Sequence, residues 1–99
     1  MLTSKQRAIL KSEASKMDAI FQIGKGGVGD AAVKSIYDAL EARELVKISV
    51  LDNSDADARE AAEEIAAQTD SEVVAVIGRK IILFKVSSKK EKRKISAMI

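Results

Sequence analysis

The stretch that decides the fold is residues 19–40, AIFQIGKGGVGDAAVKSIYDAL. An apolar run typical of a β-strand is followed by glycines and then by apolar residues at helical spacing. Four of the five glycines in the chain lie between Gly24 and Gly29. A glycine turn lets backbone N–H groups approach a ligand, and the start of a helix favours an anion. The pattern predicts a phosphate-binding junction, to which Lys25 adds a full positive charge.

A nucleotide-binding P-loop is the first alternative for this junction. Such a loop requires Gly-Lys-Ser or Gly-Lys-Thr, because the lysine contacts the β- and γ-phosphates and the hydroxyl contacts Mg²⁺. Asp30 and Ala31 stand at the corresponding places. We therefore expect no useful binding or hydrolysis of ATP or GTP. Asp30 is instead predicted to be the N-cap of the following helix.

Composition narrows the range of functions. The chain has 99 residues, of which 46% are apolar and 32% charged, as expected for one soluble domain. It has no apolar run of about 20 residues and no apolar stretch typical of a secretory signal near its start, so we expect a cytoplasmic location. Cysteine and histidine are absent, which removes thiolate metal sites and the commonest general base. We expect no enzyme activity, no metal and no cofactor.

Charge is unevenly distributed along the sequence. Residues 52–72 contain eight acids and one base, a net charge of −7. The other residues contain sixteen bases and seven acids, a net charge of +9. The bases gather near the start, in the glycine loop, at Arg79-Lys80 and near the end. Segregation of this kind indicates one surface that faces a polyanion and another that avoids it.

Hydrophobic periodicity and capping residues predict seven elements. Thr3 and Gln6 form a capping box that opens a helix reaching about Met17. The remaining elements are a strand at 19–23, a helix at 31–43, a strand at 45–51, a helix at 56–68, and strands at 72–77 and 81–86. The last two strands form a hairpin. This order predicts an α/β fold, α-β-α-β-α-β-β, in two layers with a four-stranded mixed sheet.

The three aromatic residues are predicted to lie in the core. Phe21, Tyr37 and Phe84 each lie in phase with apolar neighbours. Proteins that read single-stranded RNA by sequence usually expose aromatic side chains for base stacking. Without such side chains, we expect contacts mainly with the nucleic-acid backbone.

Five segments resemble the YhbY family, the stand-alone bacterial versions of the CRM domain. They are LTSKQR at 2–7, QIGKGGV at 22–28, ALEARELVK at 39–47, VIGRKIILF at 76–84 and KRKI at 92–95. The resemblance implies a fold similar to the C-terminal domain of translation initiation factor 3. It also implies RNA binding and association with precursors of the large ribosomal subunit. On this basis residues 1–86 are expected to form a CRM-like domain and 87–99 a basic tail, in a monomer without membrane or small-molecule ligand.

The resemblance places the family's Gly-x-x-Gly loop on Gly24, Lys25, Gly26 and Gly27. The glycines would bring the backbone to RNA phosphates and Lys25 would pair with them. Further contacts are expected from the first helix, through Lys5, Arg7 and Lys11, and from a basic arm formed by Lys89, Lys90, Lys92, Arg93 and Lys94. Because the last strand is predicted to end near Val86, removal of the residues after Ser88 is expected to leave the domain folded.

Two alternatives remain open at this point. The basic arm could serve only to keep the protein soluble. The protein could also be an interaction module that docks a basic partner through its acidic third helix. Salt-sensitive binding to ribosomal RNA in the absence of other proteins would separate RNA binding from protein docking.

Overall fold

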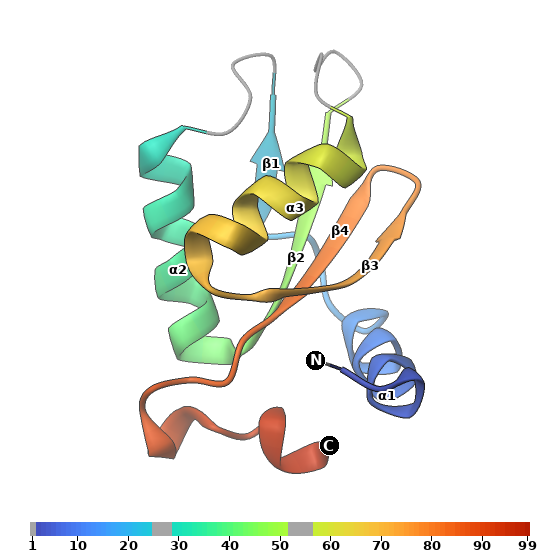
Figure 1. Ribbon diagram of the computed structural model, residues 1–99, viewed down its shortest axis with the longest axis vertical. Helices are drawn as coiled ribbons and strands as arrows, with labels where there is room; N and C mark the ends of the chain where they lie inside the picture. Colours follow the sequence, from blue (N-terminus) through green and yellow to red (C-terminus); the bar gives the residue numbers. More distant parts are fainter. Residues whose placement is uncertain (1, 25–28, 52–56) are drawn as a thin grey trace.

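The computed structural model describes residues 2–24, 29–51 and 57–99 (Figure 1). The predictions made for Lys25, Gly26 and Gly27 therefore fall outside the described residues. The elements are α1 (Ser4–Ala14), β1 (Phe21–Ile23), α2 (Asp30–Arg43), β2 (Leu45–Val50), α3 (Ala58–Thr69), β3 (Glu72–Ile77), β4 (Lys80–Phe84), and the short 3-10 helices η1 (Lys90–Lys92) and η2 (Ser96–Met98).

The predicted four-stranded mixed sheet is confirmed. Its strand order is β1-β2-β4-β3. Strand β1 pairs in parallel with β2, whereas β4 is antiparallel to both β2 and β3. The second strand of the hairpin thus lies between β2 and β3. As a consequence β1, β2 and β3 all run in the same direction.

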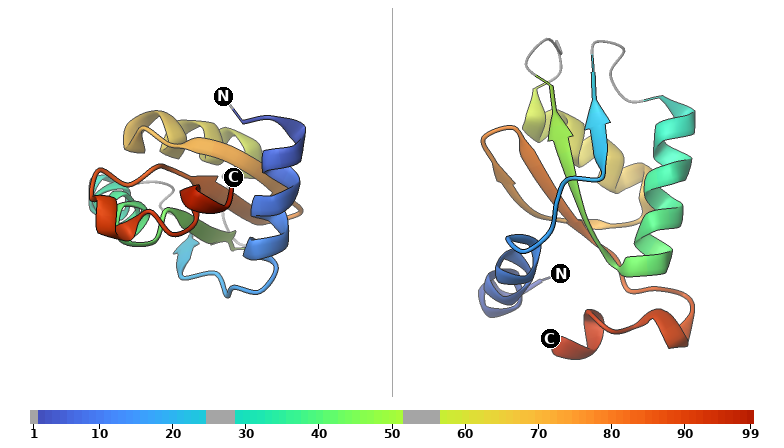
Figure 2. Two further views of the ribbon diagram at one scale, coloured as in Figure 1. Left: turned by 90° about the horizontal axis from the view of Figure 1, so that it is seen from below. Right: turned by 180° about the vertical axis from the view of Figure 1, so that it is seen from behind.

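The expectation of two layers is wrong, because helices pack on both faces of the sheet. Val46 and Ile48 of β2 belong to a core shared with α2 and α3. The neighbouring Leu45 belongs to a second core with Leu10 and Ala14 of α1. Successive strand residues point to opposite faces, so α1 covers the face opposite α2 and α3. In Figures 1 and 2 the strands lie between α1 and α2.

Helix α1 has the predicted N-terminus but ends earlier than predicted. The Thr3 hydroxyl accepts from the Gln6 N–H at 3.1 Å, and the Gln6 amide oxygen accepts from the Thr3 N–H at 2.9 Å. The helix ends at Ala14 instead of near Met17. Lys47 of β2 donates to the carbonyl oxygens of Ala14 and Met17, at 3.4 and 3.3 Å. A side chain from the sheet thus satisfies carbonyl groups that a longer helix would have paired.

The N-cap prediction for Asp30 is wrong. Gly29 is the N-cap of α2 and Asp30 is its first helical residue, where its charge still complements the helix dipole. Helix α3 does begin with an aspartate cap. The Asp57 carboxylate accepts from the N–H groups of Arg59 and Glu60, at 2.8 and 3.3 Å.

The core prediction is confirmed for two of the three aromatic residues. Phe84 is buried in the second core and Phe21 packs against the first. Tyr37 is the exception, because 39% of it is exposed. It lies on α2 one residue beyond the buried Ile36, and this rotation turns it from the sheet towards solvent.

The C-terminal segment, residues 87–99, packs onto the domain. Ser87 is buried, and its N–H donates to the Glu44 carboxylate at 2.7 Å. The other oxygen of the same carboxylate accepts from the Ser96 N–H at 2.9 Å. Ile95 and Ile99 pack against the second core. Removal of the chain beyond Ser88 would take away several of these contacts, and whether the domain then stays folded remains a prediction.

We expect Glu44→Ala to lower the free energy of unfolding by roughly 2–4 kcal/mol, because two inward-facing N–H groups lose their acceptor. Glu44→Gln keeps the shape and one acceptor oxygen, so we expect about half of that loss. Urea unfolding followed by circular dichroism measures both values. A loss below about 0.5 kcal/mol for Glu44→Ala would show that the carboxylate does not hold the segment.

Candidate nucleic-acid interface

The two described glycines of the junction, Gly24 and Gly29, lie at one edge of the sheet, where the ends of several strands meet. Strands β1, β2 and β3 run in the same direction, so their carboxyl ends lie at this edge together. The Leu51 N–H donates to the Ile23 carbonyl at 2.9 Å, and the Val50 N–H donates to the Arg79 carbonyl at 2.8 Å. Helices α2 and α3 both begin here, at the top of Figure 1. We call this region the loop edge; its described residues are Gly24, Gly29, Leu51, Asp57, Arg59, Gly78, Arg79 and Lys80.

The two described glycines of the junction are not required by packing. A Cβ on Gly24 would meet the Leu51 side chain at an ordinary distance of 3.6 Å, and a Cβ on Gly29 would meet nothing within 4 Å. Neither glycine has a positive φ, in contrast to Gly78 with φ +59°. Neither the core nor the backbone conformation explains why glycine occupies positions 24 and 29. Close approach of a ligand remains an explanation that fits both.

Three cationic side chains flank the loop edge. Arg79 donates to the Leu51 carbonyl oxygen at 3.2 Å, and Lys80 donates to the Ser49 hydroxyl at 3.1 Å. Arg59 lies exposed in the first turn of α3. Arg59 and Arg79 line an open hollow of about 470 Å³. The sequence showed that Arg79-Lys80 was basic, but only the pairing of β4 with β2 places this turn beside the glycine junction.

The basic residues predicted on α1 lie at the other end of the molecule. The long axis measures 36 Å, and Figure 1 places α1 and the C-terminal segment at the end opposite the loop edge. Lys5 and Lys11 are exposed. Arg7 instead donates to the carbonyl oxygens of Val73 and Val74, at 2.5 and 3.0 Å. The pairing of β3 with β4 is irregular at this point, so Arg7 supports a bulge in the sheet.

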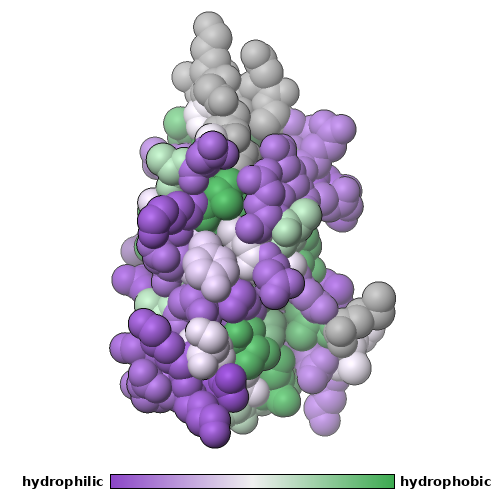
Figure 3. All heavy atoms as spheres, turned by 60° about the vertical axis from the view of Figure 1, so that its left-hand side comes forward, coloured by the Kyte–Doolittle hydropathy of each residue, from purple (hydrophilic) through white to green (hydrophobic). Residues whose placement is uncertain are grey.

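The basic residues of the C-terminal segment lie beside the end of α2. Lys89, Lys90, Lys92 and Lys94 are exposed. Arg93 donates through its Nε to the Ser87 carbonyl oxygen at 2.7 Å, which holds the segment in a turn. The predicted site residues therefore form two groups, one at the loop edge and one around α1 and the C-terminal segment. Figure 3, which brings the α2 side forward, shows hydrophilic residues over most of the surface between the two ends.

Glu41 fixes the start of the C-terminal segment. Its carboxylate accepts from the Ser88 hydroxyl, from the Ser88 N–H at 2.9 Å and from Lys85 Nζ at 3.1 Å. The hydroxyl and N–H of Ser88, together with the Lys85 ammonium, lower the pKa of Glu41 from 4.5 to about 2. Glu41 is therefore ionised throughout the physiological pH range. Its charge is already matched by these three donors.

Helix α3 presents its acids to solvent. Glu60, Glu63 and Glu64 are exposed, and Ala62 and Ile65 on the opposite side are buried in the first core. Glu64 accepts from the Gln68 amide at 3.4 Å, a contact within the helix. These three acids lie on the solvent-facing side of α3. Nothing in this arrangement favours the protein-docking alternative over RNA binding.

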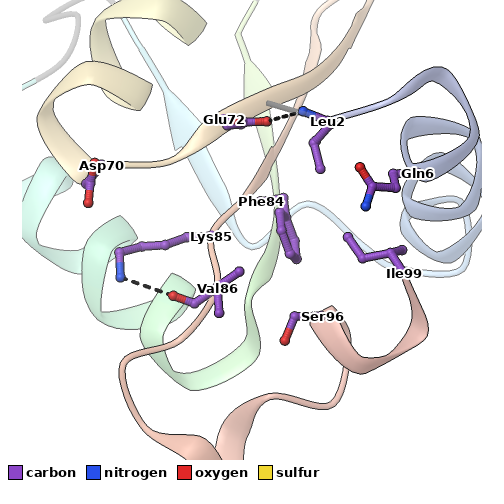
Figure 4. A pocket seen from close by; sticks show the side chains of 9 residues that line it. All are labelled: Leu2, Gln6, Asp70, Glu72, Phe84, Lys85, Val86, Ser96 and Ile99. Atoms are coloured by element: carbon purple, nitrogen blue, oxygen red, sulfur yellow. Dashed lines mark hydrogen bonds between the residues drawn. The ribbon is translucent and has the colours of Figure 1, made fainter.

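A further hollow of about 430 Å³ lies between α1, the start of β3, the end of β4 and η2 (Figure 4). Leu2, Phe84 and Ile99 supply its apolar lining, and the Glu72 carboxylate accepts from the Leu2 N–H at 3.0 Å.

In the described ranges no three His, Cys, Asp or Glu side chains are grouped so that they could hold a metal ion. Within the same ranges, no helix has the length and apolar character needed to cross a bilayer.

Comparison with known proteins assigns the family. The family model of the CRS1/YhbY (CRM) domain matches residues 2–85. The chain belongs to this family. It is 47% identical over 95 residues to the probable RNA-binding protein YqeI of Bacillus subtilis, covering 96% of this chain and 97% of that protein. It is 32% identical over 103 residues to the probable RNA-binding protein MJ0652 of Methanocaldococcus jannaschii, covering 95% and 76%.

A solved structure supports the same assignment. The solution structure of the hypothetical protein SAV1595 from Staphylococcus aureus matches with a TM-score of 0.78 and 45% sequence identity, over 95% of this chain and 98% of that one. The resemblance to the YhbY family is thus confirmed, together with the α/β fold. The likeness to translation initiation factor 3 stays a prediction.

The lowered pKa of Glu41 predicts how stability depends on pH. A carboxylate whose pKa is lowered by folding stabilises the protein above its unfolded pKa, and this contribution is lost as pH falls through the folded pKa. We therefore expect Glu41→Gln to be less stable than wild type at pH 7. The difference should shrink between about pH 4.5 and pH 2. Urea unfolding at several pH values measures it.

Glu63→Gln is the matched control for this experiment, because Glu63 is exposed on α3. It removes one carboxylate far from the C-terminal segment, and we expect its stability to follow the wild-type pH profile closely. A difference in the free energy of unfolding between Glu41→Gln and wild type that stays constant from pH 7 to pH 2 would contradict the lowered pKa of Glu41.

Proposed function

We propose that this protein binds RNA and associates with precursor ribosomal RNA during assembly of the large ribosomal subunit. The observation that carries the proposal is membership of the CRS1/YhbY (CRM) family, with a full-length relative named a probable RNA-binding protein. The geometry supports it through an open loop edge flanked by Arg59, Arg79 and Lys80. We also propose that the protein acts as a cytoplasmic monomer without a cofactor or a catalytic step.

At the loop edge, the proposed contacts are with RNA phosphates. Gly24, Gly26 and Gly27 would bring backbone N–H groups to the phosphates, and Lys25 would pair with them directly. The start of α2 adds the positive end of its dipole at the same place. Arg59 and Arg79 line the adjoining hollow and would extend the contact along the backbone.

The spacing of the two basic groups favours a long polyanion as the ligand. Lys5, Lys11 and the lysines of the C-terminal segment lie at the end of a 36 Å axis opposite the loop edge. A mononucleotide cannot reach both groups, whereas a structured RNA can follow the surface between them. Arg7 is best regarded as a support for this surface, because its guanidinium is engaged by β3.

We expect Lys25→Glu to weaken RNA binding by at least tenfold, because it replaces an attractive charge with a repulsive one at the proposed phosphate site. Filter binding with a fragment of large-subunit ribosomal RNA measures the effect. Lys16→Glu is the control for net charge: it makes the same charge change just after α1, at an exposed lysine that pairs with Glu13. Equal losses in the two variants would reduce the effect to net charge and contradict a specific role of the loop.

We expect the basic C-terminal segment to contribute to the salt dependence of binding. Truncation is unsuitable as a test, since it would remove the Ser96 donor of Glu44 and the packing of Ile95 and Ile99. Substitution of Lys89, Lys90, Lys92 and Lys94 by glutamine, with Arg93 kept, removes charge while leaving these contacts in place.

For this variant we expect the slope of log affinity against log salt to fall by roughly two units, at about 0.7 per phosphate contact with a single strand. RNA titration at several salt concentrations measures the slope, and urea unfolding confirms that the variant is folded. A slope equal to that of wild type would assign the segment to solubility alone.

A further inference from the structure

Tyr37 presents an aromatic ring on the surface of α2. It is 39% exposed, and Lys85 Nζ lies 5.2 Å from the centroid of its ring. The Lys85 side chain itself is only 11% exposed. The ammonium therefore lies beside the ring and largely out of solvent, while part of Tyr37 is exposed. A cation beneath an aromatic ring also helps to hold the ring in place.

The ring borders a small hollow lined by two carboxylates and two ammonium groups. The hollow has a volume of about 360 Å³ and is lined by Tyr37, Asp38, Glu41, Ala42, Lys89 and Lys92. No described residue accepts a hydrogen bond from the ammonium groups of Lys89 and Lys92, which are exposed. The Glu41 charge is matched by Ser88 and Lys85, and Asp38 pairs with Lys34 at 3.2 Å. The unmatched charge of the hollow is therefore positive.

We propose that this hollow binds one unpaired nucleotide of the RNA, with its base stacked on Tyr37 and its phosphate beside Lys89 and Lys92. The proposal rests on the proposed function. Every base offers a π-face to an aromatic side chain, and a neighbouring cation pairs with the phosphate. The volume lies at the lower end of the range for ligand sites, which suits a single nucleotide. A protein helix would require an apolar groove, which this lining does not provide.

Tyr37 lies on α2 between the two basic groups of the surface. It lies seven residues after Asp30 on α2, which corresponds to about 10 Å along the helix. Lys89 and Lys92 belong to the opposite group of cations. One RNA strand that meets phosphate contacts at the loop edge can therefore continue along α2 and place a base on Tyr37. The hollow gives the interface an aromatic contact in addition to its charges.

The chain offers a direct test, because Tyr37 is its only tyrosine and it has no tryptophan. Intrinsic fluorescence excited in the tyrosine band therefore reports on this residue alone. We expect a single-stranded RNA oligonucleotide to quench the fluorescence in a saturable manner. The midpoint should coincide with binding measured by the anisotropy of a labelled oligonucleotide. A fully paired RNA duplex should bind without comparable quenching.

Two variants separate the contribution of base stacking from that of apolar side-chain volume. Tyr37→Phe keeps the ring, so we expect affinity for the single strand within about threefold of wild type. Tyr37→Leu keeps apolar volume but removes the π-face, so we expect a loss of roughly 5- to 100-fold. Affinity for the duplex should change little in either variant. Circular dichroism during urea unfolding checks that both variants remain folded.

The possible outcomes distinguish this inference from the proposed function. RNA that binds without quenching, and with equal affinity for Tyr37→Leu and wild type, would overturn the nucleotide site and leave RNA binding intact. Absence of any RNA binding by the wild-type protein would overturn both. Quenching together with a loss confined to Tyr37→Leu would support the site.

Discussion

The buried carboxylate of Glu44 joins three parts of the structure. The backbone of Glu44 has a left-handed conformation, φ 66°, which ends α2 and turns the chain into β2 at the centre of the sheet. Its carbonyl oxygen accepts from the Lys85 N–H at 2.9 Å, which ties the end of β4 to the same point. Its two carboxylate oxygens hold Ser87 and Ser96. The placement of the C-terminal segment, and with it the hollow beside Tyr37, therefore depends in part on where α2 ends.

Local patterns in the sequence predicted the elements well, because each pattern follows from contacts within a few residues. The Thr3–Gln6 capping box and the helical spacing before Leu40 are examples. The early end of α1 could not be predicted in this way, since it depends on Lys47 from a distant strand. The packing of α1 on the face of the sheet opposite α2 and α3 was not predicted, for a related reason. Periodicity shows that α1 has an apolar side but not which face of the sheet that side contacts.

The candidate interface was predictable in its chemistry and less so in its geometry. The glycine junction and the basic clusters are visible in the sequence, whereas their separation along a 36 Å axis follows only from the fold. Arg7 illustrates the difference. Its charge suggested a phosphate contact, but the bulge at Val74 occupies its guanidinium. Tyr37 illustrates the converse, because one step of 100° around α2 separates a core position from an exposed aromatic.

The dipole of helix α2 acts with opposite sign at the two ends of this surface. Its N-terminus at the loop edge carries the positive end of the helix dipole, which attracts phosphate without any side chain. Its C-terminus carries the negative end and would repel the same polyanion. The C-terminal segment brings Lys89 and Lys92 to this end, where cations are favoured by the dipole and reverse the local charge. With Glu41 matched by Ser88 and Lys85, the proposed RNA complex would place phosphates at both ends of the side of α2 that bears Tyr37. Helix α3 differs from α2, because its N-terminal N–H groups already donate to the Asp57 carboxylate and its side chains on the solvent side are acidic.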